Sequence, residues 1–181
     1  MLSNSNSKNI LNKQFLIDDY HFHLQCIFIT LIVLIISYIL SPFYHSGDQS
    51  NYILVYNKLP ELSFLEGHAF YKKYLTSSEL VHFLLVSIFS RITEKVIFIS
   101  IFNSILAYGI MILFRQWKVS FLVSAITVLT NYYIYILYLP AERLKFGFIF
   151  LIFSLLYIND RKKFVFFSLL SFTSHFQMAI Q

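Results

Sequence analysis

The chain has 181 residues, of which 57% are hydrophobic and only 13% are charged. A soluble domain usually has about 25% charged residues, so this composition excludes an ordinary water-soluble fold. The net charge is +5, but the basic residues lie between apolar runs, where they set membrane orientation rather than bind nucleic acid. We therefore predict an all-α, polytopic membrane helical bundle.

The N-terminal residues 1–23 are polar, and we expect them to lie in the cytoplasm, disordered or frayed on the membrane surface. The first apolar run, Leu24–Ser41, has no small-residue cleavage site behind it and is typical of an uncleaved signal anchor. The single cysteine, Cys26, lies in this run and permits no internal disulfide. Residues 24–181 form the predicted transmembrane domain, with an outer loop at 42–78.

Four further segments come close to the ~20 apolar residues that a helix needs to cross the hydrocarbon core. A shorter apolar segment, 79–90, covers only about 18 Å, so we expect a re-entrant or interfacial helix there. The alternative is a short span that borrows residues from its flanks, which gives five to six spans in all. The chain stops at Gln181 inside an apolar segment, as expected for part of a longer protein. The four segments are Val96–Phe114, Val119–Tyr138, Pro140–Ile158 and Phe164–Gln181.

The short segment at 79–90 decides the predicted topology. If it crosses the membrane, the basic triplet at 161–163 moves outside, against the positive-inside bias. We prefer the arrangement in which it does not cross and the N-terminus is cytoplasmic, so that the turn at 140–145 lies outside. The basic residues that then lie inside are Lys8, Lys13, Arg115, Lys118, Arg161, Lys162 and Lys163.

The turn that precedes the fourth long segment is a candidate anion site. Proline suits the first position of a helix, so we expect a helix to begin at Pro140. Its N-terminus would offer unpaired N–H groups and about half a positive charge. Arg143 and Lys145 add two cations, which together suit a phosphate or diphosphate. The alternative is that Arg143 pairs with Glu142 or extends to lipid headgroups.

Two more ionisable residues lie on the same predicted side. His175 is the twelfth residue of the last segment, about 18 Å from its cytoplasmic end, and ionisable residues inside a span usually face a polar cavity. The alternative is a neutral histidine bonded to Ser171 or to a neighbouring helix. Asp48 lies just past the first span, where it is solvated, caps the next helix or points into an outer cavity.

Tyrosines and histidines elsewhere give weaker signals. Four tyrosines crowd the outer half of the 119–138 segment, which favours an interfacial aromatic belt, although a sugar stacking on one of them is the alternative. The H-x-H pair at 21–23 does not predict a metal without further ligands. The sequence has no phosphate-binding loop, dinucleotide fingerprint or nucleophile elbow. The tyrosines are Tyr132, Tyr133, Tyr135 and Tyr138.

The order of these features resembles the EpsG family of Wzy-like polysaccharide polymerases. Asp48 and Tyr52 match its Asp-x-x-x-Tyr motif after the first span. Arg143, followed four places on by Gly147, matches an arginine that opens a later span, and His175 matches a histidine near the outer face. The resemblance covers the chain from about residue 41 to the end. The family more often has Ala at the position of Gly147 and a small residue where residue 177 is Gln.

The resemblance implies a GT-C-like enzyme that joins polyprenyl-diphosphate-linked oligosaccharide repeat units at the outer face of the cytoplasmic membrane. A sugar hydroxyl attacks the anomeric carbon of the growing chain, and the polyprenyl diphosphate leaves. This needs a cation for the leaving group and a base for the hydroxyl, which implies Arg143 for the first and His175 or Asp48 for the second. No cofactor, metal or nucleic acid is implied; a flippase and a chain-length regulator are the protein partners. We expect substrate contacts from Lys145, Glu142, Tyr52 and Tyr138.

Two other functions remain open at this point. A transporter or lipid-linked sugar flippase would favour intramembrane charges and helices broken by Gly or Pro, whereas this chain has four glycines and three prolines. A non-catalytic membrane assembly subunit predicts that Asp48, Arg143 and His175 can each be replaced without effect.

Overall fold

This computed structural model describes residues 4–45 and 48–175, and it describes side chains from Tyr20 onward. These residues form helices joined by short turns. No strand occurs in these residues, so the all-α prediction is confirmed for them. The helices are α1 (Asn4–Leu40), α2 (Gln49–Lys58), α3 (Phe64–Leu75), α4 (Leu80–Phe89), α5 (Lys95–Gln116), α6 (Phe121–Thr130), α7 (Tyr132–Tyr138), α8 (Glu142–Leu156) and α9 (Arg161–Ser174), with 3₁₀ turns at Ser41–Phe43 and Leu59–Glu61.

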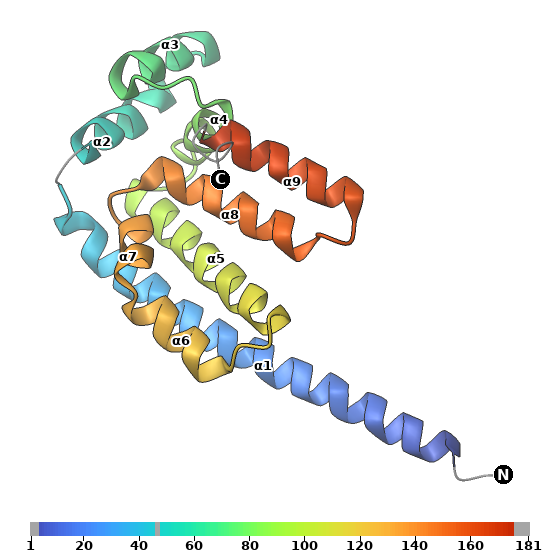
Figure 1. Cartoon of the computed structure of the whole chain (residues 1–181). Helices are drawn as coiled ribbons and strands as arrows, with labels where there is room; N and C mark the ends of the chain where they lie inside the picture. Colours follow the sequence, from blue (N-terminus) through green and yellow to red (C-terminus); the bar gives the residue numbers. More distant parts are fainter. Residues whose placement is uncertain (1–3, 46–47, 176–181) are drawn as a thin grey trace.

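Along the chain, α1, α5, the α6–α7 pair, α8 and α9 alternate in direction, so the neighbours α5 and α8 both start at the same end of the bundle (Figure 1). α1 packs against α5, α5 against α8, and α8 against α9. α1 and α5 are antiparallel, because Asn103 near the start of α5 donates to Ser37 near the end of α1, whereas His23 bonds to Tyr108 farther along α5. The bent pair α6 and α7 lies over α1 and α5.

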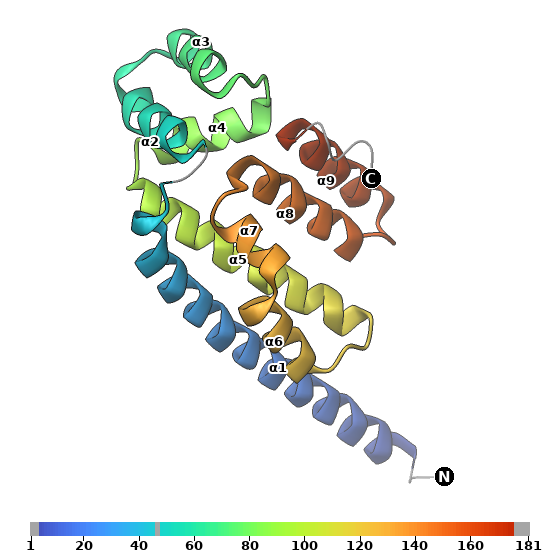
Figure 2. The same ribbon diagram turned by 60° about the vertical axis from the view of Figure 1, so that its left-hand side comes forward.

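A cap of three short helices, α2 to α4 (residues 48–90), covers the end of the bundle at which α1 ends and α5 begins (Figure 2). Ser63 and Glu66 form a capping box that starts α3. Arg91 closes the cap, because its guanidinium donates to the carbonyls of Leu59 and Leu62 at 3.0 and 2.9 Å. The cap is therefore tied to the bundle through the segment that leads into α5.

Two helical segments are long and apolar enough to cross a membrane, Tyr20–Phe43 and Lys95–Gln116. α6 and α7 would together make a third, although they are bent by 59°. Asn131 causes this break, because its side-chain oxygen accepts the N–H groups of Tyr133 and Ile134 and so starts a new helix. These numbers refer to the described residues, and the five to six spans expected from the sequence stay a prediction.

Some predicted boundaries are wrong. α1 begins at Asn4, in the stretch that was expected to be disordered or frayed on the membrane surface. α8 begins at Glu142 rather than at Pro140, because the backbone of Ala141 (φ −92°, ψ 59°) is not helical and leaves the proline in the preceding turn. The short apolar segment at 79–90 forms α4, whose ten residues cover about 15 Å.

An aromatic layer joins the cap to the bundle and places α8 beside it. The rings of Phe98 and Phe102 on α5 lie 5.6 and 4.8 Å from that of Phe146 on α8. Phe146 in turn lies 5.2 Å from the ring of His82 in the cap. Burial of these large side chains stabilises the junction, which holds the start of α8 against the cap.

Candidate functional site

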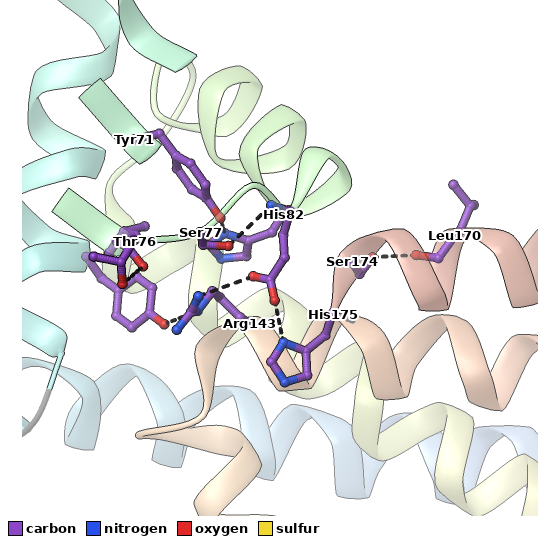
Figure 3. A network of polar contacts seen from close by, with 11 residues as sticks. Tyr71, Thr76, Ser77, His82, Arg143, Leu170, Ser174 and His175 are labelled. Atoms are coloured by element: carbon purple, nitrogen blue, oxygen red, sulfur yellow. Dashed lines mark hydrogen bonds and ion pairs between the residues drawn. The ribbon is translucent and has the colours of Figure 1, made fainter. Parts of the chain in front are cut away.

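The candidate site lies where the cap meets the start of α8 and the end of α9 (Figure 3). Glu79, just before α4, is 4% exposed and connects the two helices. One carboxylate oxygen, Oε1, is 2.5 Å from Nδ1 of His175. The other, Oε2, is 3.5 Å from Nη1 of Arg143. His175 and Arg143 follow Glu79 in the sequence by 96 and 64 positions, yet both contact its buried carboxylate.

Arg143 also forms a hydrogen bond with a tyrosine of the cap. Its Nε donates to the hydroxyl of Tyr52 at 2.8 Å, so the arginine and the tyrosine that were predicted separately as site residues are in contact. Burial raises the pKa of Tyr52 to about 12, although the nearby guanidinium acts in the opposite direction. The phenol therefore remains neutral at physiological pH. The Arg143 side chain is 23% exposed and that of His175 is 14% exposed, so one edge of the cluster reaches the surface.

A second pair of polar side chains supports the cluster from the cap. The hydroxyl of Tyr71 on α3 lies 2.7 Å from Nδ1 of His82 on α4, and both side chains are fully buried. The His82 ring also lies 6.0 Å from that of Tyr52. Within the described residues, Nε2 of His82 has no hydrogen-bond partner. This pair fixes α3 against α4 beneath Tyr52.

A buried ion pair lies next to Arg143 and joins three helices. Nζ of Lys95, at the start of α5, is 3.0 Å from Oε2 of Glu142 and 2.9 Å from Oε1 of Gln49. The amide nitrogen of Gln49 in turn donates to the carbonyl of Leu139 at 3.2 Å. A buried pair with satisfied partners orients its elements, so this group holds α2 and α5 against the start of α8.

Three of the predicted substrate contacts lie inside the protein. Lys145 is fully buried, and its Nζ donates to the carbonyl of Tyr138 at 3.0 Å. The same carbonyl accepts from Asn103 at 3.0 Å, and the Tyr138 hydroxyl donates to the carbonyl of Val128. Glu142 is 2% exposed and bonded to Lys95. In this structure these side chains contact protein, and their substrate contacts stay predictions.

Asp48 lies at the same end of the molecule as Arg143 and His175, but outside their cluster. It is exposed, sits at the N-cap of α2 and makes no side-chain cap hydrogen bond. Its carbonyl accepts the N–H of Tyr52 at 3.0 Å. The structure thus brings two of the three predicted catalytic residues together and leaves Asp48 at the surface, one helical turn from Tyr52.

Glu79 is the residue that the sequence did not single out. It stands between the polar stretch at 76–78 and an apolar helix, where an acid indicates a helix start. Its role depends on contacts with α8 and α9 that no local pattern contains. The sequence did contain a weak signal, namely an acidic residue directly before an apolar run. A carboxylate buried there is stable only when it is paired, so it would have predicted a cationic partner from another element.

No protein-family model, curated protein or solved structure matches this chain. The class is therefore defined by the fold and the site: an all-helical protein with apolar helices of membrane-spanning length and a buried ionisable cluster at one end. Among the described residues, no group of three or more His, Cys, Asp and Glu side chains is placed to hold a metal ion.

Proposed function

We propose that this protein is a Wzy-like polysaccharide polymerase of the cytoplasmic membrane. It joins polyprenyl-diphosphate-linked oligosaccharide repeat units into an extracellular or capsular polysaccharide. The observation that carries the proposal is the meeting of Arg143 and His175 on Glu79 at one end of the bundle. A cation for the leaving group and a base for the attacking hydroxyl are the two groups that this reaction requires.

The proposed roles follow from the atoms that face each other. The acceptor hydroxyl oxygen forms a bond to the anomeric carbon, and the bond from that carbon to the diphosphate oxygen breaks. His175 accepts the hydroxyl proton: with Nδ1–H donated to Glu79, the imidazole lone pair is on Nε2. Arg143 stabilises the negative charge that collects on the departing diphosphate.

Charge at this end of the bundle also favours an anionic substrate. Lys95 is paired with Glu142, and Lys145 is fully buried and bonded to a carbonyl, so Arg143 is the cation of this group whose side chain reaches the surface. A diphosphate at the exposed edge of Arg143 would pair with its guanidinium. Such a group would approach from the lipid side, because its polyprenyl tail is apolar.

The proposal includes a topology. The cap would face the cell exterior, where lipid-linked repeat units are joined, and the N-terminus would lie in the cytoplasm. The basic triplet at 161–163 starts α9 at the end opposite the cap, as the positive-inside bias favours. A GT-C-like bundle of five to six spans belongs to this proposal, as do a flippase and a chain-length regulator as partners.

Replacing Arg143 tests the proposed function. We expect Arg143→Gln to lower polymer formation on the order of 10²-fold or more, because a preorganised charge at the leaving group is lost. Arg143→Lys keeps the charge but not the two-pronged geometry, and we expect it to recover only part of the activity. The measurement is the length distribution of surface polysaccharide on a gel, made with the intact gene product in a deletion strain. The matched control is Lys72→Gln, an exposed cation of the cap.

The same gel separates the alternatives. Single repeat units on the surface without long chains support a polymerase. Loss of all surface glycan would instead indicate a flippase, and unchanged long chains in Arg143→Gln would leave only a structural role for the cluster.

A further inference from the structure

An open pocket lies beside α2, on the helix face next to the one that carries Tyr52. It has a volume of about 770 Å³ and is enclosed by the end of α1, one face of α2 and the connection from α4 to α5. Gln49 and Tyr56 of α2 line it, whereas Tyr52 on the same helix points to Arg143. Pockets of about 300–1,000 Å³ commonly take small molecules. We call it the Asn57 pocket, after an exposed residue on its wall.

The wall of the Asn57 pocket is rich in neutral hydrogen-bonding groups. Asn57 and His45 are exposed side chains on two of its sides, and Thr93 lies on a third. Tyr44 adds aromatic surface, whereas Tyr56 is 3% exposed and its hydroxyl donates to the carbonyl of Thr93. Amides, hydroxyls and an imidazole supply both donors and acceptors, and together with aromatic rings they match the alternating hydroxyl and C–H surface of a sugar.

The charged residues of the wall argue against an anionic ligand. Arg91 donates to the carbonyls of Leu59 and Leu62, and Lys95 is engaged by Glu142 and Gln49. Lys95 is therefore neutralised by Glu142, whereas the guanidinium of Arg91 is directed to neutral oxygens of the cap. A further wall residue, Glu94, is an exposed acid at the N-cap of α5, which repels phosphate.

We propose that the Asn57 pocket binds sugar residues of the glycan at a distance from the reacting bond. This proposal rests on the polymerase function above and deepens it by adding a site that holds the chain. Lys95 on the pocket wall contacts the buried Glu142 and lies over the ring of the buried Tyr52. These side chains separate the pocket from the cluster, so a sugar in the pocket does not reach His175. The pocket retains the chain rather than positions the attacked carbon.

Thiol protection tests this site without relying on catalysis. Asn57→Cys and His45→Cys place reporters on two sides of the pocket, and Ser50→Cys is the matched control, because Ser50 is exposed on α2 but does not line the pocket. Each is made in a Cys26→Ala background, which removes the buried native thiol. The purified protein in detergent is labelled with a maleimide. The probe is the repeat-unit oligosaccharide released by mild acid from the host's lipid-linked intermediate.

With the oligosaccharide at about ten times its Kd, occupancy alone should slow labelling at positions 57 and 45 about tenfold. Labelling at position 50 should not change. Inorganic diphosphate should protect none of the three. Equal labelling rates with and without oligosaccharide, or protection by diphosphate instead, would overturn the proposal.

The outcome can be separated from that of the proposed function. If the oligosaccharide protects positions 57 and 45 but Arg143→Gln makes polymer of normal length, the glycan site stands and the proposed role of Arg143 in polymerisation is rejected. If Arg143→Gln abolishes long polymer but the oligosaccharide protects none of the cysteines from labelling, the polymerase proposal stands and the proposed sugar site in the Asn57 pocket is rejected.

Discussion

A carboxylate that is 4% exposed is stable only where cations or donors replace the lost water. Glu79 has His175 at hydrogen-bond distance from Oε1 and the Arg143 guanidinium 3.5 Å from Oε2, which has no hydrogen-bond partner within the described residues. This arrangement orients His175 and Arg143 relative to each other, although they come from different helices. A carboxylate on the second nitrogen of a histidine fixes the tautomer and ring orientation, as in metal and triad sites. At the scale of single residues, Glu79 is therefore the positioning residue of the proposed site.

Replacing Glu79 with glutamine should lower polymer formation about 10–100-fold, the size of effect seen when the group that orients a functional histidine is removed. The double variant Glu79→Gln with His175→Ala should lose less activity than the product of the two single losses, because the carboxylate acts in part through the imidazole. Rates come from in vitro extension of lipid-linked repeat units. Glu61→Gln, a surface acid paired with Lys58, is the control.

An additive double variant would contradict this coupling and would assign Glu79 a purely structural role. Full activity of Glu79→Gln would remove it from the site altogether.

Arg143 and His175 could be singled out in the sequence because each is an ionisable residue at an unusual place in an apolar pattern, and their roles stay predictions. Glu79 was not predictable, because its significance lies in three-dimensional contacts across 64 and 96 residues of sequence. Lys145 and Glu142 show the opposite case. Their charge in a helix start suggested a ligand, but burial directs them to protein partners.

At the scale of elements, the contact between α5 and α8 sets the position of the proposed site. Gly109 on α5 faces Ile152 on α8, and a Cβ at position 109 would lie 3.0 Å from Ile152 Cγ2. This close approach depends on the absence of a side chain, a common device where apolar helices pack. It keeps the start of α8 in register with Lys95 and the cap.

Gly109→Val should therefore destabilise the protein by about 1–3 kcal/mol, the usual cost of overpacking a close contact. Adding Ile152→Ala should recover part of the loss, because it makes room for the new side chain. The measurement is the thermal unfolding midpoint in detergent. Ile97→Val, on the more exposed face of α5, should change the midpoint little. A neutral Gly109→Val would show that α8 can shift without penalty.

Helix boundaries illustrate which local features the sequence reveals. The break between α6 and α7 follows from one asparagine side chain that caps α7, and the late start of α8 follows from the backbone of Ala141. Apolar runs predict that helices exist, but such single-residue effects decide where they stop. The runs at 119–138 and 140–158 were thus expected as longer, continuous helices than the structure contains.

At the scale of the whole molecule, the alternation of α1, α5, the α6–α7 pair, α8 and α9 places the cap and the basic triplet at 161–163 at opposite ends (Figure 1). The apolar runs and the basic residues between them predicted this alternation. They did not predict the cap, because α2 and α3 are too polar to be recognised as spans and the contact of Tyr52 with Arg143 joins residues far apart in the sequence.

The proposed chemistry depends on which end of the bundle faces the cell exterior. A cysteine at Ser50 in the cap and one at Asn159 in the α8–α9 connection sample the two ends, and both positions are exposed. In a Cys26→Ala background, a membrane-impermeant maleimide should label Ser50→Cys in intact cells, because the cap then lies outside. Asn159→Cys should be labelled only after the cells are permeabilised. The opposite pattern would put Arg143 and His175 on the cytoplasmic side, where lipid-linked repeat units are made but not joined under the proposed scheme, and the polymerase proposal would fall.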